Sequence, residues 1–174
     1  MITVPVIETE HLILREHRLS DFDATAEHWA SERTRYTGGP HARGRAWECF
    51  SMDAGQWLLR GYGMWMLEDK ASGKTAGFVG FYEPDRYDEP EIGWILFEEF
   101  EGKGLAYEAV VAAREFGAQN FGITAPCSFI DAENERSIAL AERLGATRED
   151  TREGPRGPYY VYRHPAAEND GASK

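Results

Sequence analysis

Two glycines with one residue between them, Gly102 and Gly104, follow an apolar run of strand length, Ile92 to Phe97, and precede a helical pattern. A helix start leaves backbone N–H groups without partners and carries a partial positive charge, and glycine lets a ligand come close to the backbone. Both features suit a phosphate group. We therefore expect a phosphate-bearing ligand on the backbone amides of this turn: Gly102, Lys103, Gly104, Leu105 and Ala106.

The spacing of this turn differs from two common nucleotide motifs. Tyr107 stands where the dinucleotide fingerprint G-x-G-x-x-G needs its third glycine, and Gly104 stands where a P-loop needs Ser or Thr after the lysine. Elsewhere, the fragment 73–75 (Gly-Lys-Thr) has Glu68 in place of the first P-loop glycine and no helical pattern after it, so it predicts a hairpin turn.

Glu91 is a candidate general base. It opens the apolar run, and the period of two along a strand places it on one face with Gly93 and Ile95. Its apolar neighbours predict partial desolvation, which raises the pKa of a carboxyl group toward the range that a base needs. A carboxylate at a strand edge that faces water is the alternative interpretation.

Asn134 begins a helical pattern that ends at Gly145. Asn is a favourable N-cap residue, and glycine is the usual residue just past a helix end. Capping alone explains this pattern without any ligand.

These groups need a scaffold, and the sequence predicts its elements by hydrophobic period. Ser20 or Asp21 is expected to cap a helix, and the segment 31–44 has the composition of a loop. The other expectations are strands at 8–15, 64–67, 76–82, 92–97, 127–131 and 159–163, helices at 45–59, 105–116 and 134–144, and loops at 84–90 and 151–158.

Length and composition predict one globular domain over residues 1–164, followed by a flexible C-terminal tail at 165–174. The net charge of −11 argues against a nucleic-acid partner. The sequence has no apolar run of membrane-spanning length, so we expect a cytoplasmic protein, a monomer or homodimer, with no membrane partner. Cys49 and Cys127 are far apart, and the five histidines lack metal-ligand spacing, so neither a disulfide nor a metal site is expected.

Three stretches together resemble the GNAT N-acetyltransferases, in particular the Rim-type ribosomal-protein acetyltransferases. Residues 99–104 are similar to the acetyl-CoA motif Q/R-x-x-G-x-G/A, with Glu99 in place of the usual Gln or Arg. Residues 134–146 are similar to a second signature with Asn, Ser and Leu-Gly at fixed spacing. The start at 8–15 is similar to T-E-R-L-x-L-R, and the resemblance extends to Arg163.

The resemblance implies the GNAT fold, an α+β architecture. It has a mostly antiparallel twisted central sheet with a splayed parallel strand pair, here 92–97 and 127–131, and helices on both faces. Acetyl-CoA would lie in the gap between the two strands. Its pyrophosphate would bind the turn amides, its pantetheine arm would pair near Leu96 and Phe97, and Asn134 and Ser137 would touch it as well.

The resemblance also implies acetyl transfer to a primary amine by direct attack on the thioester. Glu91 would be the base. Ser137 would be the partner of the leaving thiolate, because Ala141 occupies the position where many relatives have Tyr. The helix pair near the N-terminus would bound the acceptor pocket, with candidate lining residues Trp29, Arg33, Tyr36 and Trp47.

The expected acceptor is a protein N-terminal α-amine or a small-molecule amine. Without a conspicuous strong base, an α-amine is favoured over lysine, since their reference pKa values differ by about 2.6 units, or about 3.5 kcal/mol. The departures at Glu99 and Ala141 leave open a GNAT-fold protein that binds acetyl-CoA but catalyses little, with a sensor or interaction role. A different nucleotide-binding protein that uses the same turn is a second alternative.

Overall fold

The computed structural model describes residues 3–167, which form one eight-stranded sheet with four α-helices. The strands are β1 (Ile7–Glu8), β2 (Leu12–Arg15), β3 (Met64–Asp69), β4 (Thr75–Tyr82), β5 (Glu91–Leu96), β6 (Cys127–Asp131), β7 (Thr147–Gly154) and β8 (Gly157–Arg163). The helices are α1 (Phe22–Trp29), α2 (Arg43–Arg60), α3 (Leu105–Phe121) and α4 (Glu135–Arg143), with short 3-10 turns η1 (Leu19–Asp21), η2 (Glu32–Thr37) and η3 (Glu98–Phe100).

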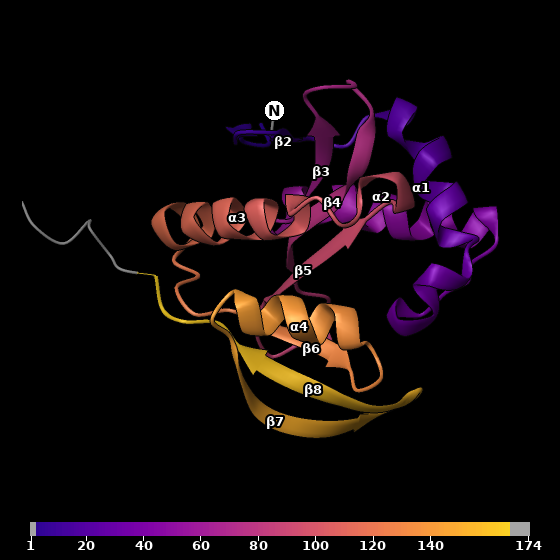
Figure 1. Ribbon diagram of the computed structural model, residues 1–174. Helices are drawn as coiled ribbons and strands as arrows, with labels where there is room; N and C mark the ends of the chain where they lie inside the picture. The colour runs from indigo at the N-terminus through magenta and orange to yellow at the C-terminus, as the bar shows by residue number, and fades with distance from the viewer. Residues whose placement is uncertain (1–2, 168–174) are drawn as a thin grey trace, which may run out of the picture.

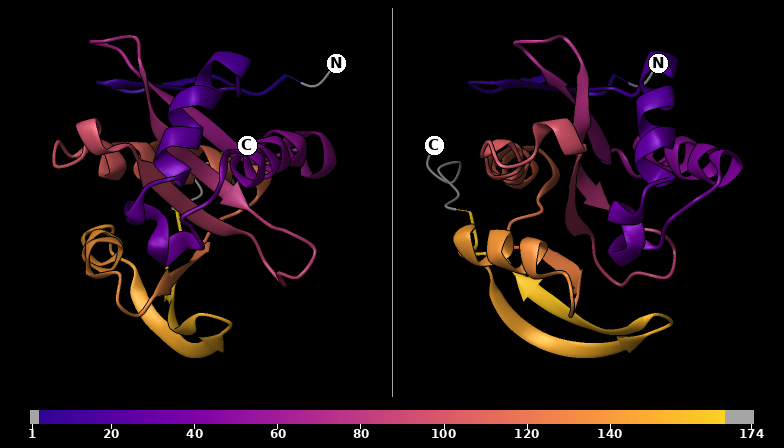
Figure 2. Two further views of the ribbon diagram at one scale, coloured as in Figure 1. Left: turned by 90° about the vertical axis from the view of Figure 1, so that its right-hand side faces the viewer. Right: turned by 45° about the vertical axis from the view of Figure 1, so that its right-hand side comes forward.

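The sheet order is β1-β2-β3-β4-β5-β6-β8-β7, and every neighbouring pair is antiparallel except β5 with β6 (Figure 1). Helices α1 and α2 cover one face of the sheet, and α3 and α4 cover the other (Figure 2). This confirms the expected α+β class with one parallel pair. Of the expected tail, residues 165–167 are described, and the Ala167 amide donates to the Thr124 carbonyl; residues 168–174 lie outside the described part of the chain.

The expected first strand at 8–15 is instead a tight hairpin of β1 and β2. The Thr9 amide and hydroxyl both donate to the Leu12 carbonyl, at 3.0 and 3.1 Å, which turns the chain back on itself. A second connection joins the hairpin to the start of α3, where Glu108 accepts hydrogen bonds from the His11 amide and ring. A local turn bond of a threonine therefore interrupts a run that looks continuous in sequence.

The prediction of a loop at 151–158 is wrong, because most of this segment forms the β7–β8 hairpin. All of β7 except its last residue is exposed, and its sequence TREDTREG has no apolar alternation. The strand exists because it pairs along its length with β8, from Thr147 with Arg163 to Gly154 with Gly157. Charged residues suit this position at the end of the sheet, where they discourage pairing with another chain.

The core between the sheet and its helices is largely aromatic, with Trp65 and Phe81 fully buried. Helix α3 comes very close to β4 at Gly117, where an added Cβ would stand 2.2 Å from Cζ of Phe81. Only glycine leaves room for the ring. This contact fixes the distance of α3, and so of the turn that precedes it, from the central strands.

A buried ion pair joins the N-terminal strands to α1. Arg15, which is 4% exposed, donates to both Asp21 oxygens at 2.9 and 2.8 Å and to Glu68 at 2.7 Å. Asp21 also accepts from the Thr75 hydroxyl and the Arg18 amide. Burial alone would raise the pKa of Asp21, but these hydrogen bonds outweigh it and lower the pKa. The stabilisation is thus present above the ordinary carboxyl pKa and is lost as pH falls through the lower folded value.

This pair explains why Asp21 does not cap α1 as the sequence predicts. Asp21 occupies the N-cap position, but its side chain makes no capping hydrogen bond to the helix. Its two oxygens are held by the Arg15 guanidinium, Thr75 and the Arg18 amide.

We expect Asp21→Ala to lower the free energy of unfolding by about 3–5 kcal/mol, because it leaves the Arg15 guanidinium buried without its main partner. Urea denaturation at neutral pH measures this loss. The matched control is Asp23→Ala, which removes an exposed pair with Arg43 and should change little. Equal losses for the two variants would contradict the assignment.

Candidate active site

Strands β5 and β6 pair at a single position, Glu91 with Cys127, and then diverge. The Phe97 amide donates to Ala76 of β4 at 2.8 Å, whereas the Ile92 carbonyl accepts from the Ser128 hydroxyl of β6 at 2.6 Å. Because successive residues of a strand turn their backbone groups to opposite neighbours, those of Trp94 and Leu96 face the widening gap toward β6.

This arrangement supports Leu96 but not Phe97 as a backbone partner for a ligand in the gap. The Phe97 amide is bonded to Ala76, and its carbonyl accepts from the Phe100 amide. The Phe97 side chain is buried and stacks on His28, with ring centroids 5.1 Å apart. Trp94, which the sequence analysis did not select, takes the place of Phe97 beside Leu96.

The two-glycine turn has the left-handed backbone that the sequence suggests, with φ of 74° at Gly102 and 78° at Gly104. The Glu108 amide donates to the Gly104 carbonyl and is the first amide of the helix with a backbone partner. Within the described part of the chain, no acceptor lies at hydrogen-bond distance from the amides of residues 102–107. Such a run of free amides at a helix start is suited to an anion.

The glutamates around the turn are paired with cations. Arg33 pairs with Glu98 at 3.2 Å and also with Glu101, which a second arginine, Arg136, contacts at 2.6 Å. Lys74 pairs with Glu99 at 3.0 Å. The side chains of Glu98 and Glu99 are exposed, whereas that of Glu101 is only 21% exposed. The pairs reduce the repulsion that three carboxylates would exert on an anion.

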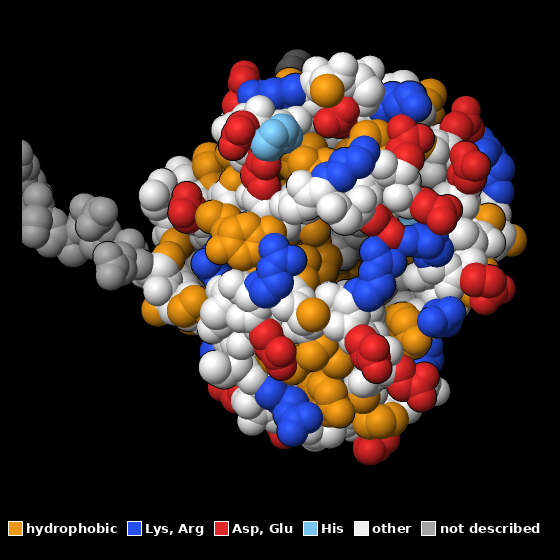
Figure 3. Space-filling view, viewed as in Figure 1, with side chains coloured by type: hydrophobic (Ala, Val, Ile, Leu, Met, Phe, Trp, Pro, Cys, Tyr) orange, Lys and Arg blue, Asp and Glu red, His pale blue; other side chains and the backbone are white. Residues whose placement is uncertain are grey.

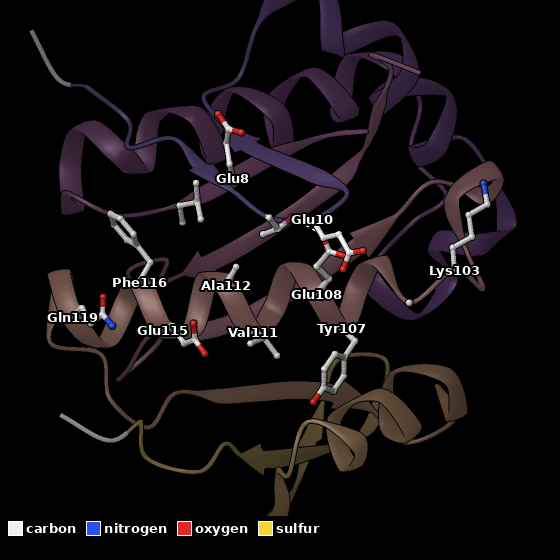
Figure 4. Close-up of a pocket in the computed structure, with 13 residues that line it drawn as sticks. Glu8, Glu10, Lys103, Tyr107, Glu108, Val111, Ala112, Glu115, Phe116 and Gln119 are labelled. Carbon is white, nitrogen blue, oxygen red and sulfur yellow. Dashed lines mark hydrogen bonds between the residues drawn. The ribbon is translucent and has the colours of Figure 1, made fainter. Parts of the chain in front are cut away.

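The place of Arg33 differs from the prediction. It does not line an acceptor pocket but lies at the turn, held by Glu98 and Glu101. The ammonium of Lys103 also turns away from the helix, as Figure 4 shows, and donates to the Glu99 carbonyl at 2.8 Å. Lys103 therefore contributes its backbone amide, and not its ammonium group, to the turn.

A cleft of about 690 Å³ opens between the diverging strands, bordered by α2, α4 and the β7–β8 hairpin. Five of the residues singled out by sequence meet on its wall: Trp29, Tyr36, Glu91, Asn134 and Ser137. In the space-filling view, hydrophobic side chains lie inside a hollow between α3 and α4, and Lys and Arg side chains border it (Figure 3).

Glu91 lies at the narrow end of the gap, where its Oε2 accepts from the Phe129 amide at 3.0 Å. Burial raises its pKa to about 7, and the Phe129 amide and Tyr87 lower it by less. The predicted desolvation is therefore present. The position combines a carboxylate that titrates near neutral pH with direct access to the cleft, as a general base needs.

Asn134 caps α4 as expected, with its side-chain oxygen accepting from the Ser137 amide at 3.3 Å. Both side chains also line the cleft, so capping leaves the Asn134 amide nitrogen and the Ser137 hydroxyl available to a ligand. Ala141, one helical turn further, is fully buried among Ile130, Ala146 and Tyr162. Its small side chain fills a packed position.

Trp47 does not belong to the cleft. Its side chain is 46% exposed and packs edge-on against Phe22, with ring centroids 4.9 Å apart. The helix pair does contribute to the acceptor end through Trp29, which stacks on His41 at 5.0 Å.

Sequence reasoning missed several residues of the cleft. Tyr82 of β4 is the direct cross-strand partner of Glu91, and Tyr87 and Phe129 lie beside it. Asp53 of α2 lines the same wall. The register between β4 and β5 would have placed Tyr82 opposite Glu91, but no local sequence pattern determines that register. No sequence feature marked Asp53 as a site residue.

A second hollow, of about 710 Å³, lies between the β1–β2 hairpin and α3 (Figure 4). It is lined by glutamates and by Tyr107, Val111 and Phe116. Only Lys103 and Gly104 among the predicted site residues reach it, so it is separate from the chemistry at Glu91.

No group of three or more His, Cys, Asp or Glu residues within 3–167 is placed to hold a metal ion. Both cysteines are buried and free. None of the helices in this part of the chain has the length and apolar character that crossing a membrane requires.

Comparison with known proteins gives concordant results. An acetyltransferase from Agrobacterium tumefaciens str. C58 is 32% identical, over 94% of this chain and 96% of that one, with a TM-score of 0.86. The ribosomal L7/L12 α-N-protein acetyltransferase RimL, solved in complex with coenzyme A, has a TM-score of 0.74 over 92% of this chain and 97% of that one; at 17% identity it shows the shared fold alone.

Among curated proteins, the uncharacterized protein YkkB of Bacillus subtilis (strain 168) is 31% identical over 90 residues, which is 49% of this chain. The match spans 52% of YkkB, about half its length. The acetyltransferase (GNAT) domain family matches residues 11–147. Since this is most of the chain, and the splayed sheet and the free turn amides agree with it, the protein belongs to the GNAT acetyltransferase family.

Proposed function

We propose that this protein transfers the acetyl group of acetyl-CoA to a primary amine by direct attack on the thioester. The observation that carries the proposal is the place of Glu91. This carboxylate stands where β5 and β6 part, it opens on the cleft, and burial raises its pKa to about 7. The proposed acceptor is a protein N-terminal α-amine or a small-molecule amine.

The free groups along the gap suit coenzyme A. The unpaired amides of residues 102–107 fit a pyrophosphate, and the backbone of Trp94 and Leu96 fits the amides of a pantetheine arm. Asn134 and Ser137 line the cleft between β5 and β6, together with Trp94. Bound there, acetyl-CoA supplies an activated acetyl group as a thioester.

Glu91 would accept the proton of the incoming ammonium group, and its desolvation makes it basic enough to do so near neutral pH. The Phe129 amide holds the carboxylate in place. Ser137 is the proposed proton partner of the leaving thiolate, directly or through water, since Ala141 is buried and has no polar group.

A base with a pKa near 7 favours amines that lose their proton easily. The reference pKa of an α-amine lies about 2.6 units below that of lysine, so deprotonating lysine at neutral pH costs about 3.5 kcal/mol more. The proposed acceptors are therefore α-amines and small amines of similarly low pKa.

A GNAT protein that binds acetyl-CoA with little catalysis is the second candidate, favoured by the buried Ala141 and by Glu99 in the acetyl-CoA motif. The deciding experiment measures melting with acetyl-CoA, ATP and NAD, and then CoA release with a library of amines. Catalysis predicts selective stabilisation by acetyl-CoA and turnover with at least one amine. Stabilisation without any turnover would favour the second candidate.

Glu91→Gln should lower kcat by about 10²–10⁴-fold with acetyl-CoA affinity intact, because it removes the base but not a cofactor contact. In the wild type, kcat/KM should rise as pH rises through about 7, where the Glu91 carboxylate forms. The loss in the variant should shrink at high pH, where the amine deprotonates unaided. Glu115→Gln, on the exposed side of α3, is the charge-matched control. Activity of Glu91→Gln within a few-fold of wild type at neutral pH would assign the proton to an ordered water instead.

Gly104→Val should weaken acetyl-CoA binding by about tenfold or more, since a branched residue at φ of 78° costs about 1–2 kcal/mol and displaces the turn amides. Calorimetric titration measures the affinity. Glu101→Gln should change binding mildly or improve it, because it frees Arg33 and Arg136 beside the turn. Loss of binding in Glu101→Gln would contradict binding through backbone amides.

Asn134→Asp separates capping from cofactor contact, because Asp caps a helix as well as Asn does. If the Asn134 amide nitrogen touches the cofactor, the variant should melt like wild type yet bind acetyl-CoA more weakly, by about tenfold, through the lost donor and the added charge. Unchanged affinity in a stably folded variant would leave Asn134 with capping alone.

A further inference from the structure

Asp53 lies in the cleft, and its carboxylate has no role in the fold or in the proposed reaction. It projects from α2 and lines the same cavity as Glu91. Within residues 3–167 no hydrogen bond or ion pair involves its side chain. Burial is the only cause that acts on its pKa, which rises to about 7. A carboxylate that is desolvated without a partner costs stability, and such groups persist mostly where a ligand uses them.

Four arginines line the cleft, and two of them are paired with carboxylates outside it. Arg45 pairs with Glu48 at 2.5 Å, and Arg152 pairs with Asp150 at 2.9 Å. Arg86 lies over the ring of Tyr87, 5.1 Å from its centroid. The fourth, Arg156, lies between β7 and β8 and beside Gly38. Within residues 3–167 none of the four forms an ion pair with Asp53, so a cation from outside would supply its counter-charge.

The wall between Asp53 and Glu91 is aromatic. Tyr82 is the cross-strand partner of Glu91. Burial raises the pKa of Tyr82, Arg86 lowers it, and the charges of Asp53 and Glu91 raise it, so both carboxylates act on this tyrosine. Trp29 and Tyr36 line the same cavity. Aromatic faces attract ammonium groups, so the wall suits a chain with a cation at each end.

We propose that the acceptor is a small primary diamine, whose reacting amine meets Glu91 while its second ammonium group pairs with Asp53. This assignment rests on the proposed acetyl transfer and narrows its substrate class. A monoamine at Glu91 would leave Asp53 unpaired, whereas a diamine reaches both of these carboxylates.

The transfer itself is balanced. Glu91 takes the proton that makes the reacting amine neutral, the nitrogen bonds to the acetyl carbon as the carbon–sulfur bond breaks, and the proton that the nitrogen then loses passes to the sulfur. The second ammonium group is unchanged. In a short free diamine the charge of the second ammonium group lowers the pKa of the reacting amine, and in the cleft Asp53 offsets that charge.

The test compares kcat/KM for 1,3-diaminopropane to 1,6-diaminohexane with that for n-alkylamines of equal length, all with acetyl-CoA. Wild type should prefer at least one diamine by about tenfold or more, the size expected for a hydrogen bond to a charged group. Asp53→Asn should lose this preference, with its kcat/KM for the diamine falling to about that for the n-alkylamine of equal length. Asp85→Asn, an exposed residue of the 83–90 loop outside the cleft, removes the same charge and should keep the preference.

Stability provides an independent control. Because burial raises the pKa of Asp53, the charged carboxylate is disfavoured in the folded state, and this penalty grows as pH rises from about 4 to about 7. Asp53→Asn should therefore melt at or above the wild-type temperature at pH 8. Loss of preference in such a variant is a loss of recognition and not of fold.

Calorimetric binding of the same diamine to the protein with CoA present separates this inference from the proposed function. If amines are acetylated with equal preference by wild type and Asp53→Asn, the transferase stands and the diamine assignment is overturned. If no amine is acetylated, the proposed function fails, and the assignment is then decided by binding. A diamine affinity about tenfold lower in Asp53→Asn supports it, and equal affinities overturn it.

Discussion

The parting of β5 and β6 after one residue pair is the constraint on which the cleft depends. Where two strands separate, their backbone N–H and C=O groups lose their partners in the sheet, and this costs free energy. Other hydrogen bonds must then stabilise the point where the strands part. Here a directed chain of hydrogen bonds does so. Arg114 donates to Nδ1 of His164, whose Nε2 donates to the Ser128 hydroxyl, and that hydroxyl donates to the Ile92 carbonyl at 2.6 Å. Burial lowers the pKa of His164 to about 4, so its ring stays neutral and Nδ1 can accept.

The same point of the sheet fixes Glu91. Ser128 and Phe129 are consecutive in β6, so the hydroxyl that holds the Ile92 carbonyl and the amide that holds the Glu91 carboxylate come from neighbouring residues. The divergence of the strands and the position of the candidate base are therefore set together. Beyond this point the backbone of Trp94 and Leu96 faces an open gap, so the proposed cofactor contacts and the proposed base lie at different points of one strand.

Charge is arranged differently at the turn before α3 and at the acceptor end of the cleft. At the turn before α3, Arg33, Arg136 and Lys74 pair with the glutamates, so that the free amides dominate the local field. At the acceptor end, Asp53 and Glu91 form no ion pair within the described residues. Their neighbours are aromatic residues and Arg86, whose charge opposes the burial that raises the pKa of Glu91. An anionic cofactor and a cationic acceptor suit these two places.

Local sequence patterns determined much of this protein: the hairpin of β3 and β4, the helix beginning at Leu105 after two glycines, and the Asn134 cap. Each depends on backbone geometry or hydrophobic period within a dozen residues. Tertiary structure alone decided the rest. The strand β7 exists only through its pairing with β8, Asp21 is drawn from capping by Arg15, and Arg33 and Trp47 lie outside the pocket they were expected to line. Asp53 and Glu91 line the same cleft only because α2 packs over the sheet. Ion pairs and cavity walls bring together residues that are far apart in the sequence, and no local pattern encodes such contacts.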